Sequence, residues 1–121
     1  ELPEKVYGCE VWRNLDWLND DEKVYLDCGA HPNLSRALSS VFDSQIVGGK
    51  RYYLAAEGRR LSNATFYESH ACDTYYMLNY AMDLTPLIKD KSLDIADYVV
   101  GYIRRFERSV KEMLHKCSGT E

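Results

Sequence analysis

Residues 94–117, DIADYVVGYIRRFERSVKEMLHKC, carry the clearest structural signal in this sequence. Apolar side chains recur there every three or four positions, which is the spacing of one face of an α-helix. This face consists of Ile95, Val99, Tyr102, Ile103, Phe106, Val110, Met113, Leu114 and Cys117. The opposite face carries Arg104, Arg105, Arg108 and Lys111. The stretch predicts a long amphipathic helix, capped by Asp94 or Ser92, with its apolar face turned inward.

Outside this helix the pattern predicts short strands and further helices. Strand-like runs cover 6–12, 23–28 and 75–85. Helical spacing covers 34–46, which ends near Gly48-Gly49, and 50–61. The fold class is therefore predicted as α+β and mainly helical, with few short strands. Since a few short strands rarely make a self-sufficient sheet, we expect residues 1–121 to be a single domain or a fragment of a larger α/β domain.

The composition narrows the classes of protein. Hydrophobic residues make up 45% of the 121 residues and charged residues 28%, a normal globular balance. A net charge of −4 argues against nucleic acid and against an anionic membrane surface as partners. No apolar run approaches the ~18 residues of a membrane span. The four cysteines (9, 28, 72 and 117) form no C-x-x-C pair, which predicts reduced thiols, mostly in the core, and a cytoplasmic location.

Several stretches together carry a resemblance to a known family. They are YGCEVWRNLDWL (7–18), KVYLD (23–27), ALSSVFDSQIVGGKRYYLA (37–55), SNATFYESHACDT (62–74) and NYAMDLTPLI (79–88). Together they resemble the C-terminal segment of PIG-L/LmbE-like N-acetylglucosaminyl deacetylases. Bacterial members with a fused glucosamine-6-phosphate deaminase/isomerase-like domain are the most similar. The family's Tyr-x-x-x-x-Trp and Ser-Gln pair correspond to Tyr7–Trp12 and Ser44-Gln45, and Phe42 stands where many members have His.

The resemblance implies an activity for a larger parent protein. That parent would hydrolyse an N-acetyl group by metal-activated water, with zinc in its catalytic domain. The family's metal motif is Ala-His-Pro-Asp-Asp, whereas Ala30-His31-Pro32 is followed by Asn33 and Leu34. His31 is therefore expected to start a helix, and no catalytic residue, metal ligand or cofactor is assigned to this segment. Its expected partner is the rest of the parent polypeptide, with a homo-oligomer as an alternative.

Other arrangements of reactive side chains remain as alternatives. Cys28, His31, His70 and Cys72 are suitable zinc ligands, but their spacing is too loose for a known zinc finger. A nucleophile at Cys72 with His70 and Asp73 is disfavoured, because neighbours in sequence rarely form such a unit. A sugar or phosphate site is expected at Lys50, Arg51, Arg59 and Arg60, against the reading that these are exposed helix charges.

Two further readings concern the whole chain and the tyrosines. Tyr52 and Tyr53 are suited to stack on a sugar ring, although tyrosines at such positions commonly just pack. The chain as a whole is alternatively a free-standing interaction module that docks a partner through its apolar faces. A small zinc protein is the third reading.

Overall fold

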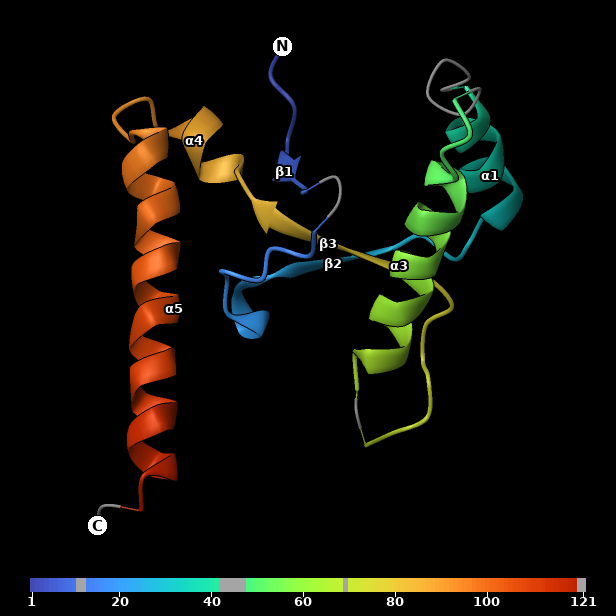
Figure 1. The fold of residues 1–121 in the computed structure, drawn as a ribbon. Coiled ribbons are helices and arrows are strands. Elements are labelled where there is room, and N and C mark those ends of the chain that lie inside the picture. Colours follow the sequence, from blue (N-terminus) through green and yellow to red (C-terminus); the bar gives the residue numbers. More distant parts are fainter. Residues whose placement is uncertain (11–12, 42–47, 69, 120–121) are drawn as a thin grey trace. The chain divides into compact units, whose positions relative to one another are not determined.

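The computed structural model describes residues 1–10, 13–41, 48–68 and 70–119. The elements follow one another along the chain as shown in Figure 1. They are β1 (Tyr7–Gly8), the 3-10 helix η1 (Asp20–Glu22), β2 (Val24–Asp27), α1 (Pro32–Ser40), α3 (Tyr52–Phe66), β3 (Leu78–Asp83), α4 (Thr85–Lys89) and α5 (Ile95–Cys117). The strands form one sheet in the order β1-β3-β2. The predicted α+β class, with short strands and a long C-terminal helix, is confirmed.

The chain divides into two compact units, residues 1–24 with 81–121 and residues 25–80. In the first unit, β1 pairs antiparallel with β3, so that Tyr7 lies opposite Asp83 and Gly8 opposite Met82. The core of this unit is formed by the buried side chains of Leu15, Leu18 and Met82. Half-buried side chains pack around them, namely Trp17, Leu84, Tyr98, Val99 and Tyr102. The N-terminal part of α5 thus completes the core of the first unit.

Glu10 fixes the loop that carries these core leucines. Its carboxylate accepts hydrogen bonds from the Leu15 N–H at 2.9 Å and from the Trp17 Nε1–H at 2.9 Å. Leu15 has a φ of 54°, a left-handed conformation that leucine rarely adopts. The two bonds to one carboxylate and the burial of the Leu15 side chain hold the backbone in this conformation.

The second unit is organised around a buried asparagine on α3. Asn63 is 4% exposed and its Nδ2 donates to the Leu78 carbonyl at 3.1 Å, which ties α3 to β3. The Tyr80 hydroxyl donates to the backbone carbonyl of Asn63 at 3.3 Å. Tyr25 on β2 packs edge-on against the rings of Tyr67 and Tyr80. An aromatic cluster and a buried amide therefore hold this unit together.

The strands lie where the sequence predicts them but are shorter. β1 covers two residues of the predicted 6–12, of which 11 and 12 lie outside the described residues. β3 ends at Asp83 and not at 85, because Thr85 begins α4 and Pro86 occupies its first turn, where a missing N–H costs nothing. The short helix α4 is absent from the sequence prediction, which gives only a strand over 75–85 in this region.

The two central helices differ from their predicted ranges at both ends. α1 begins at Pro32 and not at 34, and His31 occupies its N-cap position, so the expectation that His31 starts a helix is confirmed. α1 ends at Ser40, and residues 42–46 of the prediction lie outside the described residues. α3 begins at Tyr52 and not at 50, and it runs to Phe66, five residues past the predicted end at 61.

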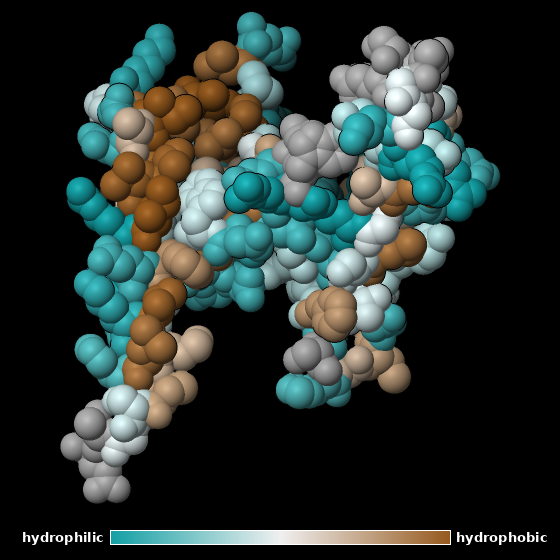
Figure 2. All heavy atoms as spheres, viewed as in Figure 1, coloured by the Kyte–Doolittle hydropathy of each residue, from teal (hydrophilic) through white to brown (hydrophobic). Residues whose placement is uncertain are grey.

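The C-terminal helix has the predicted bounds, and Asp94 is its N-cap, accepting a hydrogen bond from the Asp97 N–H at 3.1 Å. Val99 packs on the core as predicted, whereas the prediction that Ile103, Val110 and Met113 turn inward is wrong. Ile103, Val110 and Met113 are 41%, 40% and 66% exposed, and Figure 2 shows hydrophobic residues gathered along α5. The core of the first unit covers only the part of the face near Tyr98, Val99 and Tyr102.

Two further sequence expectations need correction. Cys9, Cys72 and Cys117 are exposed and Cys28 is half-buried, so the cysteines are free thiols outside the core. Arg105 does not lie free on a solvated face, because its Nε donates to Glu22 Oε1 at 2.6 Å and its guanidinium lies 4.3 Å from the centre of the Tyr102 ring. None of the helices that the structure describes combines the length and apolar character needed to cross a membrane.

The environment of Arg105 predicts an effect on stability. Arg105→Ala removes the ion pair to Glu22 and the cation–π contact with Tyr102, and should lower the free energy of unfolding by about 1 kcal/mol. Arg104→Ala, the same change at an exposed neighbour, should cost less than about 0.5 kcal/mol. Urea unfolding of both variants measures the difference. Equal midpoints would show that the Arg105 contacts contribute nothing.

Candidate functional site

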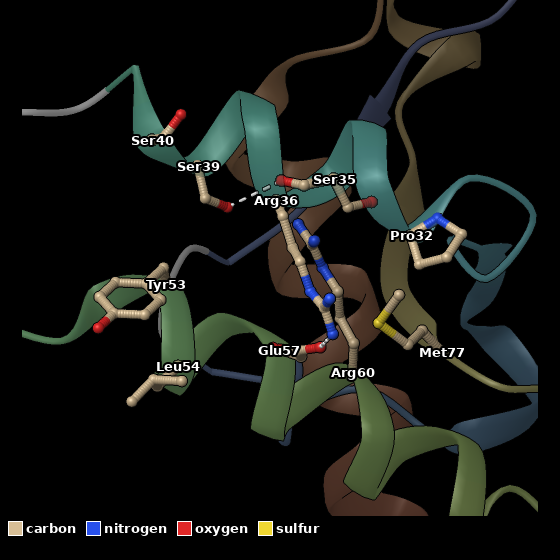
Figure 3. Close-up of a pocket in the computed structure, with 10 residues that line it drawn as sticks. All are labelled: Pro32, Ser35, Arg36, Ser39, Ser40, Tyr53, Leu54, Glu57, Arg60 and Met77. Carbon is tan, nitrogen blue, oxygen red and sulfur yellow. Dashed lines mark hydrogen bonds and ion pairs between the residues drawn. The ribbon is translucent and has the colours of Figure 1, made fainter.

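The second unit contains a cavity of about 600 Å³ between α1 and α3, called here the α1–α3 cavity. Helix α1 lines it with Pro32, Ser35, Arg36, Ser39 and Ser40. Helix α3 lines it with Tyr53, Leu54, Glu57 and Arg60, and Met77 closes one side (Figure 3). The lining positions recur every three or four residues on each helix, which places them on one face of each. This volume is that of a small-molecule pocket.

The charged residues of the α1–α3 cavity come from both helices. Arg36 on α1 donates through Nη2 to Glu57 Oε1 on α3 at 3.0 Å. This hydrogen bond and the charge of Glu57 raise the pKa of Arg36 above its usual value. Because the Arg36 side chain is 63% exposed, the pair positions the two groups more than it stabilises the fold.

Arg60 is the second guanidinium of the cavity. In Figure 3 it extends from α3 into the space between the helices, as Arg36 does from α1. Among the described residues, Arg60 has no hydrogen-bond or ion-pair partner, whereas Arg36 is bound to Glu57. Arg60 also lines a second cavity of about 400 Å³, together with Asp27, Cys28, His31 and neighbouring residues of α1. One unpaired guanidinium is therefore available to a ligand.

The sugar or phosphate site expected at Lys50, Arg51, Arg59 and Arg60 is not assembled as a set. Only Arg60 lines the α1–α3 cavity. Lys50 is exposed before α3, Arg51 is exposed at its N-cap position, and Arg59 is half-buried with its Nε buried and without a partner in the described structure. Of the two tyrosines, Tyr53 lines the cavity and Tyr52 does not.

Two charged residues of the cavity were missed by the sequence reasoning. Arg36 and Glu57 lie on different helices, 21 positions apart, and meet only because α1 packs against α3. The sequence offered one signal for this pair, namely opposite charges at Arg36 and Glu57 on two separate helices. Nothing in the spacing said that those two faces adjoin.

The reactive side chains considered for metal or nucleophile chemistry are not gathered. Cys28 and His31 line the second cavity, whereas His70 and Cys72 do not. Within the ranges that the structure describes, no group of three His, Cys, Asp or Glu side chains is placed to hold a metal ion. His70, Cys72 and Asp73 make no hydrogen bond with one another in the described structure. Whether the chain takes up zinc stays a prediction for metal analysis.

Comparison with known proteins adds no relative to this picture. The chain matches no family model, and no curated protein and no solved structure matches it.

Proposed function

We propose that the chain is the C-terminal segment of a PIG-L/LmbE-like amino-sugar N-deacetylase domain, in a protein with a glucosamine-6-phosphate deaminase/isomerase-like domain. By itself the segment is not catalytic. It covers a catalytic domain and contributes the α1–α3 cavity. The resemblance of the stretches between Tyr7 and Ile88 supports the family, and the expected location is the cytoplasm.

One observation carries the proposal that the segment covers another domain: apolar side chains on its helices are left in solvent. On α1, Leu34 and Leu38 are 56% and 58% exposed. On α5, Met113 and Leu114 are 66% and 62% exposed. Continuous apolar faces of this kind are typical of surfaces that dock another protein surface. In the proposed parent, the catalytic domain occupies them.

The residues of the segment do not fit a catalytic zinc site. Asn33 and Leu34 stand where the metal motif has carboxylates, and Asn33 is exposed on α1. The described residues also bring no three potential ligands together. We therefore assign no step of the hydrolysis to this segment, whose proposed role is to cover the catalytic domain.

The absence of catalysis is tested directly on the chain. We expect no acetate release from N-acetylglucosamine or its 6-phosphate, and no ammonia release from glucosamine 6-phosphate, with or without added zinc. The reason is that the carboxylates that would activate water are missing after Pro32. Turnover that is lost in His31→Ala or in His70→Ala would overturn the proposal, because it would place a catalytic site in this segment.

The exposed face of α5 also favours a second candidate, a free-standing interaction module. Light scattering distinguishes the two. A segment lacking its catalytic domain should self-associate through its uncovered apolar faces, whereas a module should be a compact monomer. One zinc ion per chain in the same preparation would favour the third reading, a small zinc protein.

A further inference from the structure

The charges of the α1–α3 cavity form a pattern that specifies a ligand. Two guanidinium groups, Arg36 and Arg60, and one carboxylate, Glu57, line it, so its net charge is +1. The whole chain carries −4, so this positive site is a local feature and not a general property of the surface. The three groups come from facing helices and point into one space (Figure 3). A ligand that matches them carries an anion and a cation on one small body.

We propose that the α1–α3 cavity binds a small hydroxylated molecule that carries both a phosphate monoester and an ammonium group. A phosphate monoester carries about −1.5 to −2 charges at neutral pH, and an ammonium group adds +1. The ligand is then close to −1 and balances the cavity. That the ligand is a hydroxylated, sugar-like molecule rests on the proposed function, whereas its two charged groups are inferred from the residues of the cavity alone.

The two arginines are suited to the phosphate. Guanidinium presents five N–H donors in a planar fork, which matches phosphate oxygens in a bidentate manner. Arg60 has all of its donors available among the described residues, and Arg36 gives only Nη2 to Glu57. Since the two side chains enter from opposite helices, a tetrahedral group between them can accept hydrogen bonds from both. A planar carboxylate would leave part of this donor set unused.

Glu57 is suited to bind the ammonium group of the ligand, and the apolar lining residues are suited to contact its carbon skeleton. Glu57 uses Oε1 for Arg36, and its Oε2 has no hydrogen-bond partner in the described part of the chain, so it can accept from an ammonium group. Tyr53 is 42% exposed and lines the cavity together with Leu54, and the two offer an apolar surface to the carbon skeleton. An anion without an amine would leave Glu57 Oε2 with no cationic group of the ligand to bind.

Calorimetric titration of the chain at fixed ionic strength tests the proposal. The probes are O-phosphoethanolamine, glucosamine 6-phosphate, glucose 6-phosphate, glucosamine and sulfate. We expect both phosphorylated amines to bind about tenfold more tightly than glucose 6-phosphate. Glucosamine and sulfate should bind at least about tenfold more weakly than glucose 6-phosphate. Tighter binding of glucosamine 6-phosphate than of O-phosphoethanolamine supports the amino-sugar function. Equal binding of the two keeps the charge pattern and counts against that function.

Variants separate the cavity from general attraction to positive charge. Arg60→Gln should weaken every phosphorylated probe about tenfold or more, and Glu57→Gln should abolish the preference for the amines over glucose 6-phosphate. Arg51→Gln is the matched control, because Arg51 precedes α3 and does not line the cavity. Circular dichroism and melting establish that each variant is folded. Binding of sulfate as tight as that of the amines, an equal loss in Arg51→Gln and Arg60→Gln, or no binding of any probe at millimolar concentration would overturn the proposal.

Discussion

Leu18→Ala is expected to lower the free energy of unfolding by about 2–5 kcal/mol. Leu18 is 2% exposed and lies with Leu15 and Met82 at the centre of the first unit. Truncation there removes apolar contacts and leaves a cavity, and the Glu10 bonds to the neighbouring loop oppose its collapse. Thermal or urea unfolding followed by circular dichroism measures the effect.

The matched control for Leu18 is Leu114→Ala, the same chemical change on α5. Leu114 is 62% exposed, so the change should cost less than about 0.5 kcal/mol in the monomer. If Leu114→Ala destabilised the chain as much as Leu18→Ala, the apolar face of α5 would be buried in solution. In that case, a concentration-dependent melting temperature would identify a second copy as the cover.

Asn63→Leu should cost about 1–3 kcal/mol although leucine is of similar size. The replacement leaves the carbonyl of Leu78, a residue 1% exposed, without the hydrogen bond that Asn63 Nδ2 donates at 3.1 Å. An unpaired buried carbonyl costs more than the added apolar surface returns. Urea unfolding checks the result.

Thr65→Val on the same helix is the control for Asn63. The Thr65 hydroxyl also donates to a carbonyl, that of Leu61 at 3.0 Å, but this bond lies in solvent and water replaces it. The control should change stability by less than about 0.5 kcal/mol. A loss in Thr65→Val equal to that in Asn63→Leu would mean that burial of the amide is not what makes it important.

The periodicity of the sequence predicts the elements better than their surroundings. The spacing from Ile95 to Cys117 predicts α5 to within a residue, because a helix is a local structure whose cap and apolar stripe lie in one stretch. The same spacing shows which face is apolar but not what covers it, so the inward orientation of Ile103 and Met113 is predicted wrongly. Burial is a property of the neighbouring elements, which no local pattern contains.

The candidate site shows the same limit. Arg60 is recognised as a candidate because clustered arginines on a helix are suited to bind anions. Arg36 is not recognised, because its partner Glu57 belongs to a different helix and only the packing of α1 on α3 brings them to 3.0 Å. Gly58 has a related effect. Its low helix propensity, about 1 kcal/mol below that of alanine, counts against a helix over 50–61, yet α3 continues through it to Phe66.

The burial of Asn63 has a consequence for covalent modification. Asn63-Ala64-Thr65 is an acceptor sequence for N-linked glycosylation, and the atom that would receive the glycan is Nδ2. In the folded chain this atom is enclosed and bonded to Leu78, so a glycan there excludes the native fold. The acceptor sequence Asn33-Leu34-Ser35 begins instead at an exposed residue of α1 and can carry a glycan without unfolding. In a glycosylating compartment, occupancy at Asn63 would therefore mark chains modified before they folded, and occupancy at Asn33 would not.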